Sequence, residues 1–276
     1  MTEPGSGLPI ADHVLDFWRA LDSLFQRVEP TWWGAVVTDA RFPSISDANY
    51  ARIDVASDEV SADDIERSLV PELDAAGVTS TFHVVSFHPE ANTTLLAQLS
   101  ARGHRLTWDL VMDHDPAATA TPPIDLVVEA LADSEDLWTR VRGSMALFGI
   151  DEGEAQEQLC AIERDVLFPG GKRWFGVRNA SGSLDALGAL IVLGHVGYID
   201  NVATFPHARG RGLASAITAH ITSVARADGA THVCLFADPE AAPTVRMYER
   251  LGFRPAGSLA AVRGPIPTVV ADTAPR

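Results

Sequence analysis

Two stretches of the chain repeat one order of elements, and this repeat restricts the fold more than any other feature of the sequence. Residues 81–105 and 231–254 each read as a short β-rich run, then Pro-Glu-Ala, then an apolar-periodic helix that ends at Gly-His-Arg or Gly-Phe-Arg. A Pro-Glu-Ala match alone is at chance level, but the shared order of strand, turn, helix and capping glycine is not. We interpret the chain as a duplicated domain, with two unrelated α/β lobes as the alternative.

We expect a break between the halves at residues 113–123, where prolines and small polar residues stand and no periodic apolar pattern is present. We therefore predict a first domain over 1–116, a linker over 117–123, a second domain over 124–264 and a poorly ordered tail over 265–276. The length of 276 residues allows one large or two ordinary domains, which agrees with this division.

The second half shows a clear pattern of strands and helices. A first strand is followed by two helices, the earlier one capped by Asp133 or Ser134. Three strands come next, and a long amphipathic helix that ends at Gly229 leads into a strand–helix–strand unit. This order predicts a mixed α+β fold with a central sheet flanked by helices. The expected strands are 124–131, 173–178, 186–193, 195–204, 231–237 and 256–263, and the expected helices are 133–149, 152–167, 212–227 and 241–251.

Charge excludes several classes of function. The formal net charge is −16, and an acidic surface repels phosphate groups, so a nucleic-acid or anionic-membrane partner is not expected. The acidity is uneven, because residues 1–123 hold 19 acidic and 7 basic side chains, whereas residues 124–276 hold 18 and 14. Lys172 is the only lysine among 21 basic residues, which we attribute to codon bias and not to function.

Cysteine content and hydropathy indicate the compartment. Cys160 and Cys234 are too few and too distant for a disulfide framework or a zinc cluster, so we expect reduced, buried thiols and no metal. The start of the sequence has no basic region followed by an apolar run, so no signal peptide is expected. No apolar run approaches the ~20 residues that span a bilayer. We expect a cytoplasmic protein, and the oligomeric state stays open.

One glycine-rich loop indicates the chemistry. The strand expected at 195–204 leads into Arg209-Gly-Arg-Gly212, which opens directly into the helix at 212–227. The two glycines lack Cβ, so the backbone can approach a ligand closely. The first N–H groups of the helix have no internal partner, and the helix dipole adds partial positive charge there. With its two arginines, the loop is suited to a phosphate or pyrophosphate, although an exposed helix-start loop with incidental arginines is the alternative.

Two common phosphate-binding motifs do not fit this loop. A P-loop requires Gly-Lys-Ser/Thr, where this chain has Gly-Leu-Ala. A dinucleotide fingerprint requires a third glycine where Ser215 stands, and it normally opens its domain. The loop therefore indicates another class of phosphate-containing ligand.

The sequence Arg209-Gly-Arg-Gly-Leu-Ala214 resembles the Arg/Gln-x-x-Gly-x-Gly/Ala acyl-CoA loop of the GNAT superfamily of N-acyltransferases. About 35 residues later, Met247-Tyr-Glu-Arg-Leu-Gly-Phe253 is similar to the family's Leu-Tyr-x-x-x-Gly-Phe signature. The resemblance covers roughly residues 124–264. It departs from the family at one point, because Ala241 or Ala242 stands where an asparagine often contacts the CoA arm.

The resemblance implies two GNAT-like domains, each with a central mixed β-sheet flanked by helices, and acetyl-CoA as the cosubstrate. It places the pyrophosphate on the loop amides and the pantetheine arm along the preceding strand, which such an arm can extend by β-augmentation. A backbone N–H near Val202 or Ala203 would polarise the thioester carbonyl. The residues implied to contact the cosubstrate are Val202, Ala203, Thr204, Arg209, Gly210, Arg211, Gly212, Leu213 and Ala214.

The first half lacks such a loop and resembles a degenerate repeat that has lost acyl-CoA binding. Where the loop would fall, residues 58–66 crowd acidic side chains that would repel a pyrophosphate. Part of this acidity has a structural explanation, since Ser61 and Asp64 have the spacing of a helix capping box. Trp32 and Trp33 are unusual there, and we expect them in a core or an interface, with a place in the acceptor site as the alternative.

Direct attack of an amine on a thioester requires a group that protonates the leaving thiol and a base that removes a proton from the amine. The resemblance assigns the first role to Tyr248, and packing against the sheet is the alternative. Asp200 is the first candidate for the base because it lies on the strand that leads to the loop. Glu129 and His195 are weaker candidates, and a water chain could replace any of them.

The sequence therefore predicts an N-acetyltransferase acting on a primary amine of a small molecule or peptide. The acidic first half would attract a cationic acceptor. A narrower alternative is a mycothiol-synthase-like enzyme that acetylates a cysteinyl sugar amine. An alternative of another class is an acyl-CoA-binding sensor without turnover.

Overall fold

The structure is a computed structural model that describes residues 10–78, 81–118 and 126–267. Residues 119–123 of the predicted linker and residues 268–276 of the predicted tail lie outside these described residues.

The chain forms two compact units, and each unit combines segments that lie far apart in the sequence. Unit 1 contains Met1–Leu24 and Trp108–Ser258, and unit 2 contains Phe25–Thr107 and Leu259–Arg276. The predicted division assigned one continuous segment to each domain. In the structure, the first helix belongs to the unit that contains most of the second half, and the last strand is divided between the two units at Ser258.

The sheet of unit 1 is mixed, as expected. Its hydrogen-bonded order is β11-β5-β10-β9-β8-β7-β6, in which β9 and β10 run parallel and the pairs from β6 to β9 run antiparallel. The strands are β5 (Arg105–His114), β6 (Glu129–Leu131), β7 (Arg173–Arg178), β8 (Leu184–Leu193), β9 (Val196–Thr204), β10 (His232–Ala237) and β11 (Phe253–Gly264).

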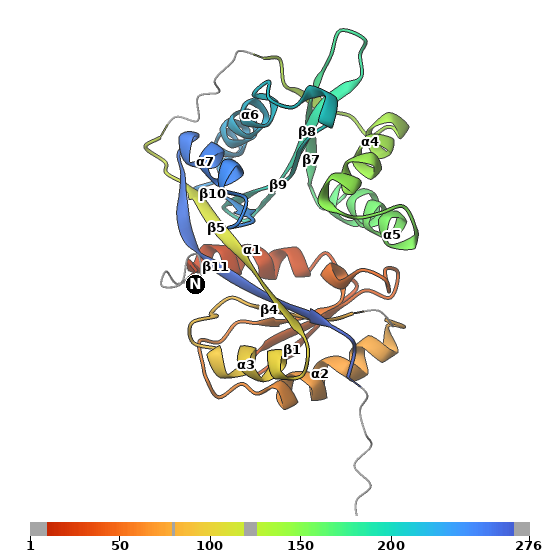
Figure 1. Cartoon of the computed structure of the whole chain (residues 1–276), viewed down its shortest axis with the longest axis vertical. Helices are drawn as coiled ribbons and strands as arrows, with labels where there is room; N and C mark the ends of the chain where they lie inside the picture. The colour runs from red at the N-terminus through yellow and green to blue at the C-terminus, as the bar shows by residue number, and fades with distance from the viewer. Residues whose placement is uncertain (1–9, 79–80, 119–125, 268–276) are drawn as a thin grey trace, which may run out of the picture. The chain divides into compact units, whose positions relative to one another are not determined.

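Helices cover both faces of these strands (Figure 1). Buried side chains of α6 (Leu213–Ala227) and α7 (Ala242–Arg250) pack on one face, where Leu190 and Ile199 point. On the other face, α4 (Glu135–Met145) and α5 (Glu154–Ile162) pack on Leu187 and Ala189, and α1 (Asp12–Asp22) packs on Ile191 and Cys234. Successive side chains of β8 point to opposite faces of the sheet, so they contribute to two separate hydrophobic cores.

Several local expectations for unit 1 are confirmed. The Ser134 side chain accepts a hydrogen bond from the N–H of Leu137 and caps α4. Gly229, with φ +90°, follows the end of α6. Cys160 and Cys234 are free and buried. In the part of the chain that the structure describes, no helix is both long and apolar enough to cross a bilayer.

Unit 2 has the sheet order β1-β2-β3-β4-β11, in which β3 and β4 run parallel and the other pairs run antiparallel. Its further elements are β1 (Arg27–Thr31), β2 (Gly34–Thr38), β3 (Tyr50–Ile53), β4 (Phe82–Ser86), α2 (Ala62–Ala75) and α3 (Thr93–Ala101). Trp33 is 1% exposed and belongs to the core, whereas Trp32 is 58% exposed, so the expectation for this pair holds for one member.

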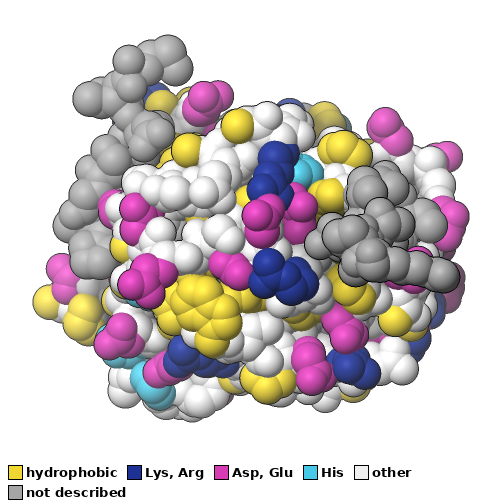
Figure 2. Space-filling model, turned by 90° about the horizontal axis from the view of Figure 1, so that it is seen from below, with side chains coloured by type: hydrophobic (Ala, Val, Ile, Leu, Met, Phe, Trp, Pro, Cys, Tyr) yellow, Lys and Arg dark blue, Asp and Glu magenta, His cyan; other side chains and the backbone are white. Residues whose placement is uncertain are grey.

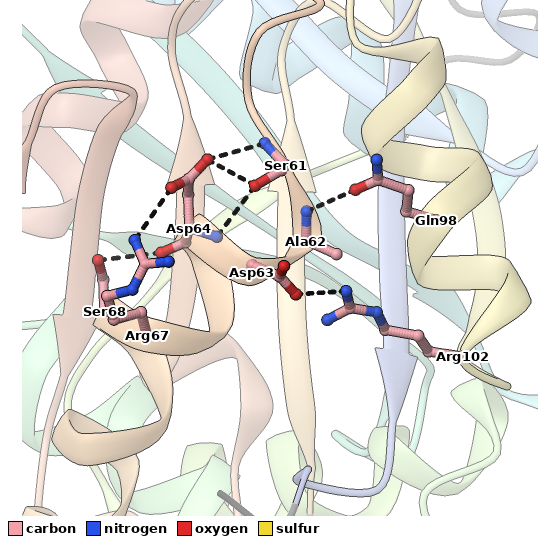
Figure 3. Close-up of polar contacts among 8 residues, drawn as sticks. All are labelled: Ser61, Ala62, Asp63, Asp64, Arg67, Ser68, Gln98 and Arg102. Atoms are coloured by element: carbon pink, nitrogen blue, oxygen red, sulfur yellow. Dashed lines mark hydrogen bonds and ion pairs between the residues drawn. The ribbon is translucent and has the colours of Figure 1, made fainter. Parts of the chain in front are cut away.

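The start of α2 explains part of the acidity of the first half (Figure 3). Ser61 Oγ accepts from the N–H of Asp64, and the Asp64 carboxylate accepts from the N–H of Ser61, which is the predicted capping box. Arg67 pairs with Asp64, and Arg102 pairs with Asp63. Figure 2 shows the same interleaving of acidic and basic side chains across one face of the molecule.

The two repeated segments exchange their last strands. In the structure, residues 81–105 form β4, α3 and the start of β5, and residues 231–254 form β10, α7 and the start of β11, which confirms the shared order of elements. The strand β5 pairs antiparallel with β10, and β11 pairs antiparallel with β4. Each first strand therefore pairs with the last strand of the other segment.

One buried histidine of unit 2 gives a prediction about acid stability. His83 is 2% exposed in β4, and its Nδ1 lies 3.0 Å from the carbonyl oxygen of Ser46. Burial and then the charge of Arg263 lower the pKa of His83 to about 4, although Asp47 acts in the opposite direction. Because the unfolded chain binds this proton with an ordinary pKa of about 6.5, protonation favours unfolding.

We expect the free energy of unfolding to fall as the pH decreases from 6.5 to about 4, with roughly 3 kcal/mol attributable to His83. Urea titrations at several pH values measure it. The His83→Gln variant should show a shallower decrease over that interval, and an unchanged slope would contradict the assignment.

Candidate active site

The strands β9 and β10 separate in the middle of unit 1. Their parallel pairing runs from Val196–His232 to Ile199–Leu235. Beyond that point β9 continues to Thr204 and stays paired with β8 on its other side. Residues 200–204 therefore present an edge toward β10 with which an extended, amide-containing ligand can pair. The predicted contact residues Val202, Ala203 and Thr204 lie on this edge.

A β-bulge begins where the strands separate. The register between β8 and β9 shifts between Leu187 and Ala189, so that Asp200 lies opposite Ala189 while Ala203 lies opposite Leu187. Asn201 has φ +52°, a left-handed conformation that asparagine tolerates better than most residues. A bulge changes the direction of side chains and N–H groups, and strained backbone of this kind is enriched at functional sites.

A buried ion-pair network holds this bulge, and it contains the only lysine of the chain. Lys172 is 1% exposed, and its Nζ lies 2.8 Å from Glu163 Oε1 and 2.7 Å from Asp200 Oδ2. The side chain of Asn201 donates to Glu163 Oε1 over 3.0 Å. The same ammonium lies 5.4 Å from the ring centroid of Trp174. From the sequence we attribute this single lysine to codon bias. In the structure, Lys172 connects two acidic side chains beside the bulge.

Burial and the neighbouring charges have opposite effects on the pKa values of the groups in this network. Burial disfavours the charged form of Lys172, but the carboxylates of Asp200 and Glu163 outweigh it and raise its pKa. Burial raises the pKa of the Glu163 carboxyl, and the Lys172 ammonium only partly offsets this. Glu163 begins η3, a π-helical turn over Glu163–Leu167 that continues α5, and its Oε2 has no hydrogen-bond partner among the described residues.

Asp200, the predicted base, has both oxygens in hydrogen bonds. Oδ2 accepts from Lys172, and Oδ1 accepts from the N–H of Asn201 over 2.8 Å. The side chain is 30% exposed, and each carboxylate oxygen has a second lone pair. Asp200 is therefore oriented by the network and can still accept a further hydrogen bond.

Tyr248, the predicted proton donor, lies on α7 and is 7% exposed. Its ring packs edge-on against Phe253, with centroids 5.9 Å apart. Burial, followed by the charge of Asp200, raises the pKa of Tyr248 to about 12. The structure thus brings the two predicted catalytic residues within electrostatic range of each other, and the phenol stays protonated at neutral pH.

The predicted anion loop has the expected backbone. Gly210 has φ +75° and Gly212 has φ +76°, both in the left-handed region that favours glycine. A Cβ on Gly210 would meet no atom within 4 Å, so the space beside the loop is open. Leu213 and Ala214 form the first turn of α6, whose N–H groups lack partners within the helix.

The two arginines of the loop have different surroundings. Arg211 donates to Asp185 Oδ2 over 2.8 Å, and the other oxygen of Asp185 lies 2.9 Å from Nε2 of His207. Asp185 thereby fixes the loop from the start of β8. Arg209 donates only to the carbonyl oxygen of Thr204, over 3.3 Å, and within the described residues no carboxylate lies in ion-pair distance of it. Arg209 is therefore the cation available to a bound anion.

The weaker candidates for the base lie elsewhere. Glu129 is on β6 and pairs with Arg178 at 2.5 Å. His195 precedes β9, so it lies at the end of that strand opposite to Thr204. The structure also shows Lys172, Glu163 and Asn201 at the site, which the sequence interpretation missed. The described residues bring three potential metal ligands together at a different place, beside the start of β10.

Comparison with protein families agrees with this geometry. Residues 147–253 match the model of the acetyltransferase (GNAT) family, a segment that includes the ion-pair network, the bulge, the loop and Tyr248. No curated protein matches the chain.

Solved structures share the fold. A GCN5-related N-acetyltransferase from Kribbella flavida is 18% identical, with a TM-score of 0.61 over 96% of this chain and 98% of that chain. A functionally unknown conserved protein from Staphylococcus epidermidis is 12% identical, with a TM-score of 0.66. The match covers 84% of this chain and 90% of that chain.

Proposed function

We propose that this chain, whose residues 147–253 match the model of the acetyltransferase (GNAT) family, transfers an acetyl group from acetyl-CoA to a primary amine of a small molecule or peptide. The observation that carries the proposal is the open edge of β9 at residues 200–204, which ends at a glycine-rich helix start. An extended ligand with amides along its length and phosphates at one end matches both features.

The residues of the site have distinct roles in this proposal. The N–H groups from Gly210 to Ala214 donate to the pyrophosphate, and Arg209 adds an unpaired positive charge. The backbone of Val202, Ala203 and Thr204 pairs with the pantetheine arm, as an added strand would. Acetyl-CoA supplies the acyl group in an activated form, as a thioester.

Proton transfers fall to the two residues beside the bulge. Tyr248 donates a proton to the leaving thiolate, since its raised pKa keeps the phenol protonated. Asp200, whose carboxylate is held in place by Lys172, removes a proton from the attacking amine through a free lone pair. Proton exchange with water then restores Asp200 and Tyr248. An N–H donor near Val202 or Ala203 stabilises the negative charge that develops on the carbonyl oxygen.

The test of the proposal is a charge reversal in the loop. The Arg209→Glu variant is expected to bind CoA at least about tenfold more weakly than the wild type, because it replaces an attraction to the pyrophosphate by a repulsion. Isothermal titration calorimetry measures the dissociation constant. Arg254→Glu is the matched control, because Arg254 also donates to backbone carbonyls and is exposed.

Wild-type protein that shows no saturable CoA binding would contradict the proposal, as would equal binding by the Arg209→Glu variant. Turnover is then measured with a panel of small cationic and neutral amines that includes a cysteinyl sugar amine. Tight CoA binding without turnover across the panel would favour the acyl-CoA-binding module over the enzyme.

A further inference from the structure

Three side chains from distant parts of the sequence converge on one side of unit 1. His13 lies in the first turn of α1, Asp113 lies near the end of β5, and His232 begins β10. One potential ligand atom from each lies within 4.8 Å of the others. The distance from His13 Nε2 to Asp113 Oδ2 is 2.9 Å, and the two imidazole rings stack at 3.9 Å.

The backbone explains why these side chains meet. Asp113 lies opposite Cys234 in the β5–β10 register, so the two share a face of the sheet. His232 is two residues from Cys234 and points to the same face. This is the face that α1 covers, with Phe17 packed near Cys234. The helix thereby places His13 above the two side chains of the sheet.

Two polar atoms of the cluster have no hydrogen-bond partner among the described residues. These are Nε2 of His13 and Oδ1 of Asp113, and both are buried. Although Nε2 of His13 lies close to Oδ2 of Asp113, the pair lacks the alignment of a hydrogen bond. Buried polar atoms without partners are costly and call for an explanation, and a bound ion is one.

We propose that His13, Asp113 and His232 bind a divalent transition metal ion, of which zinc is the reference case. Two imidazoles and one carboxylate are a ligand set that suits zinc, cobalt or nickel and not magnesium or calcium. Metal–ligand bonds of about 2.0–2.2 Å place tetrahedral ligand atoms roughly 3.4 Å apart, which small side-chain rotations reach from the present positions.

The cluster is also accessible enough to be loaded. The side chain of His13 is 10% exposed and that of Asp113 is 26% exposed, so an ion can enter and water can complete its coordination. A metal here would fasten α1 to β5 and β10. The same helix carries Trp18, which stacks on Phe236 with centroids 5.2 Å apart. Trp18 also lies edge-on to Tyr198, two residues before Asp200, so the metal would fix the helix that packs on this part of β9.

Untagged full-length protein, freed of metal by a chelator, is titrated with zinc in the absence of CoA. We expect one equivalent to bind with a dissociation constant of roughly 1 µM or tighter. At about a hundredfold excess over that constant, the thermal midpoint should rise by roughly 5 °C or more. Cobalt in place of zinc should give the visible absorption bands of a low-symmetry site.

The His232→Gln and Asp113→Asn variants should each bind zinc at least about tenfold more weakly. His220→Gln is the matched control, because His220 is a half-buried histidine on α6 that packs against Phe175, and its binding should be unchanged. Absence of saturable binding by the wild type would overturn the proposal, whether or not the variants fold. So would binding that all three variants weaken equally, because it would indicate adsorption to surface histidines. These readouts do not involve acetyl-CoA, so they are independent of the proposed enzymatic activity.

Discussion

The Lys172→Met variant is expected to lose about 3–5 kcal/mol of folding free energy, because it removes the only cation from a buried network that contains two carboxylates. For a chain of this size the loss corresponds to a decrease of roughly 10 °C in the thermal midpoint. Methionine fills a similar volume, so the effect reports on the charge more than on packing. Partial protonation of Glu163 limits the loss, because burial already raises the pKa of that carboxyl.

Two further variants separate the network from a general effect of removing a positive charge. Arg173→Met removes a neighbouring cation that pairs with Asp228 at the surface, and it should cost less than about 1 kcal/mol. In the double variant Lys172→Met/Glu163→Gln, one of the two unpaired carboxylates is neutral, so roughly half of the lost stability should return. Chemical denaturation of the four proteins measures these differences. A loss for Lys172→Met no larger than that for Arg173→Met would show that the network contributes little.

The Tyr248→Phe variant is expected to lower turnover about tenfold or more while leaving the dissociation constant for CoA nearly unchanged. The substitution keeps the ring that packs against Phe253 and removes only the hydroxyl that we propose as the proton donor. Steady-state kinetics and calorimetry on the same preparations measure both quantities. Tyr50→Phe, in unit 2, removes a hydroxyl elsewhere and should retain wild-type turnover.

The pH dependence of turnover gives a second test of the role of Tyr248. The pKa of about 12 keeps the Tyr248 phenol protonated between about pH 6 and 9. Loss of the Tyr248 proton therefore does not reduce activity in that interval. The Tyr248→Phe variant should show the same dependence of turnover on pH as the wild type, at a lower turnover. Equal turnover of wild type and variant would reassign Tyr248 to packing.

Most of the secondary structure of unit 1 follows from local sequence patterns. The helix predicted at 212–227 is α6, Leu213–Ala227, because its apolar stripe and Gly229 mark both its face and its end. The strand predicted at 173–178 is β7 without change. The two helices predicted at 133–149 and 152–167 are shorter as α-helices, since α4 leads into the 3-10 turn η2 (Ala146–Phe148) and α5 into η3. Single turns of 3-10 or π-helix keep nearly the same spacing of apolar residues as an α-helix. The hydrophobic pattern of the sequence therefore does not distinguish these turns from the α-helices that they continue.

The ends of the segments were less predictable. The strand predicted at 124–131 is β6, Glu129–Leu131, and its first two residues lie outside the described residues. The last strand was expected at 256–263, but β11 begins at Phe253, directly after the glycine that follows α7. The residues of β11 that pair with β4 are Ala260–Gly264, and no local pattern contains this contact between distant parts of the sequence.

The same limit applies to the candidate site. The glycines of the loop and Tyr248 stand in recognisable motifs, so they could be identified from sequence. Lys172 lies 9 residues from Glu163 and 28 residues from Asp200, and these side chains meet only because separate strands and a helix end bring them together. The one available signal was the presence of a single lysine in a chain rich in arginine. A common origin of the two halves stays a prediction, although the exchanged strands agree with it.

The strand exchange between the repeated segments resembles a domain-swapped dimer whose two halves are joined in one chain. If the chain were split at the linker, each fragment would keep its first strand, β4 or β10, and lose one of the two strands that pair with it. The fragments would then carry unpaired backbone edges, which promote association with other strands. Their most complementary partner would be each other, because each fragment carries the strand that the other has lost.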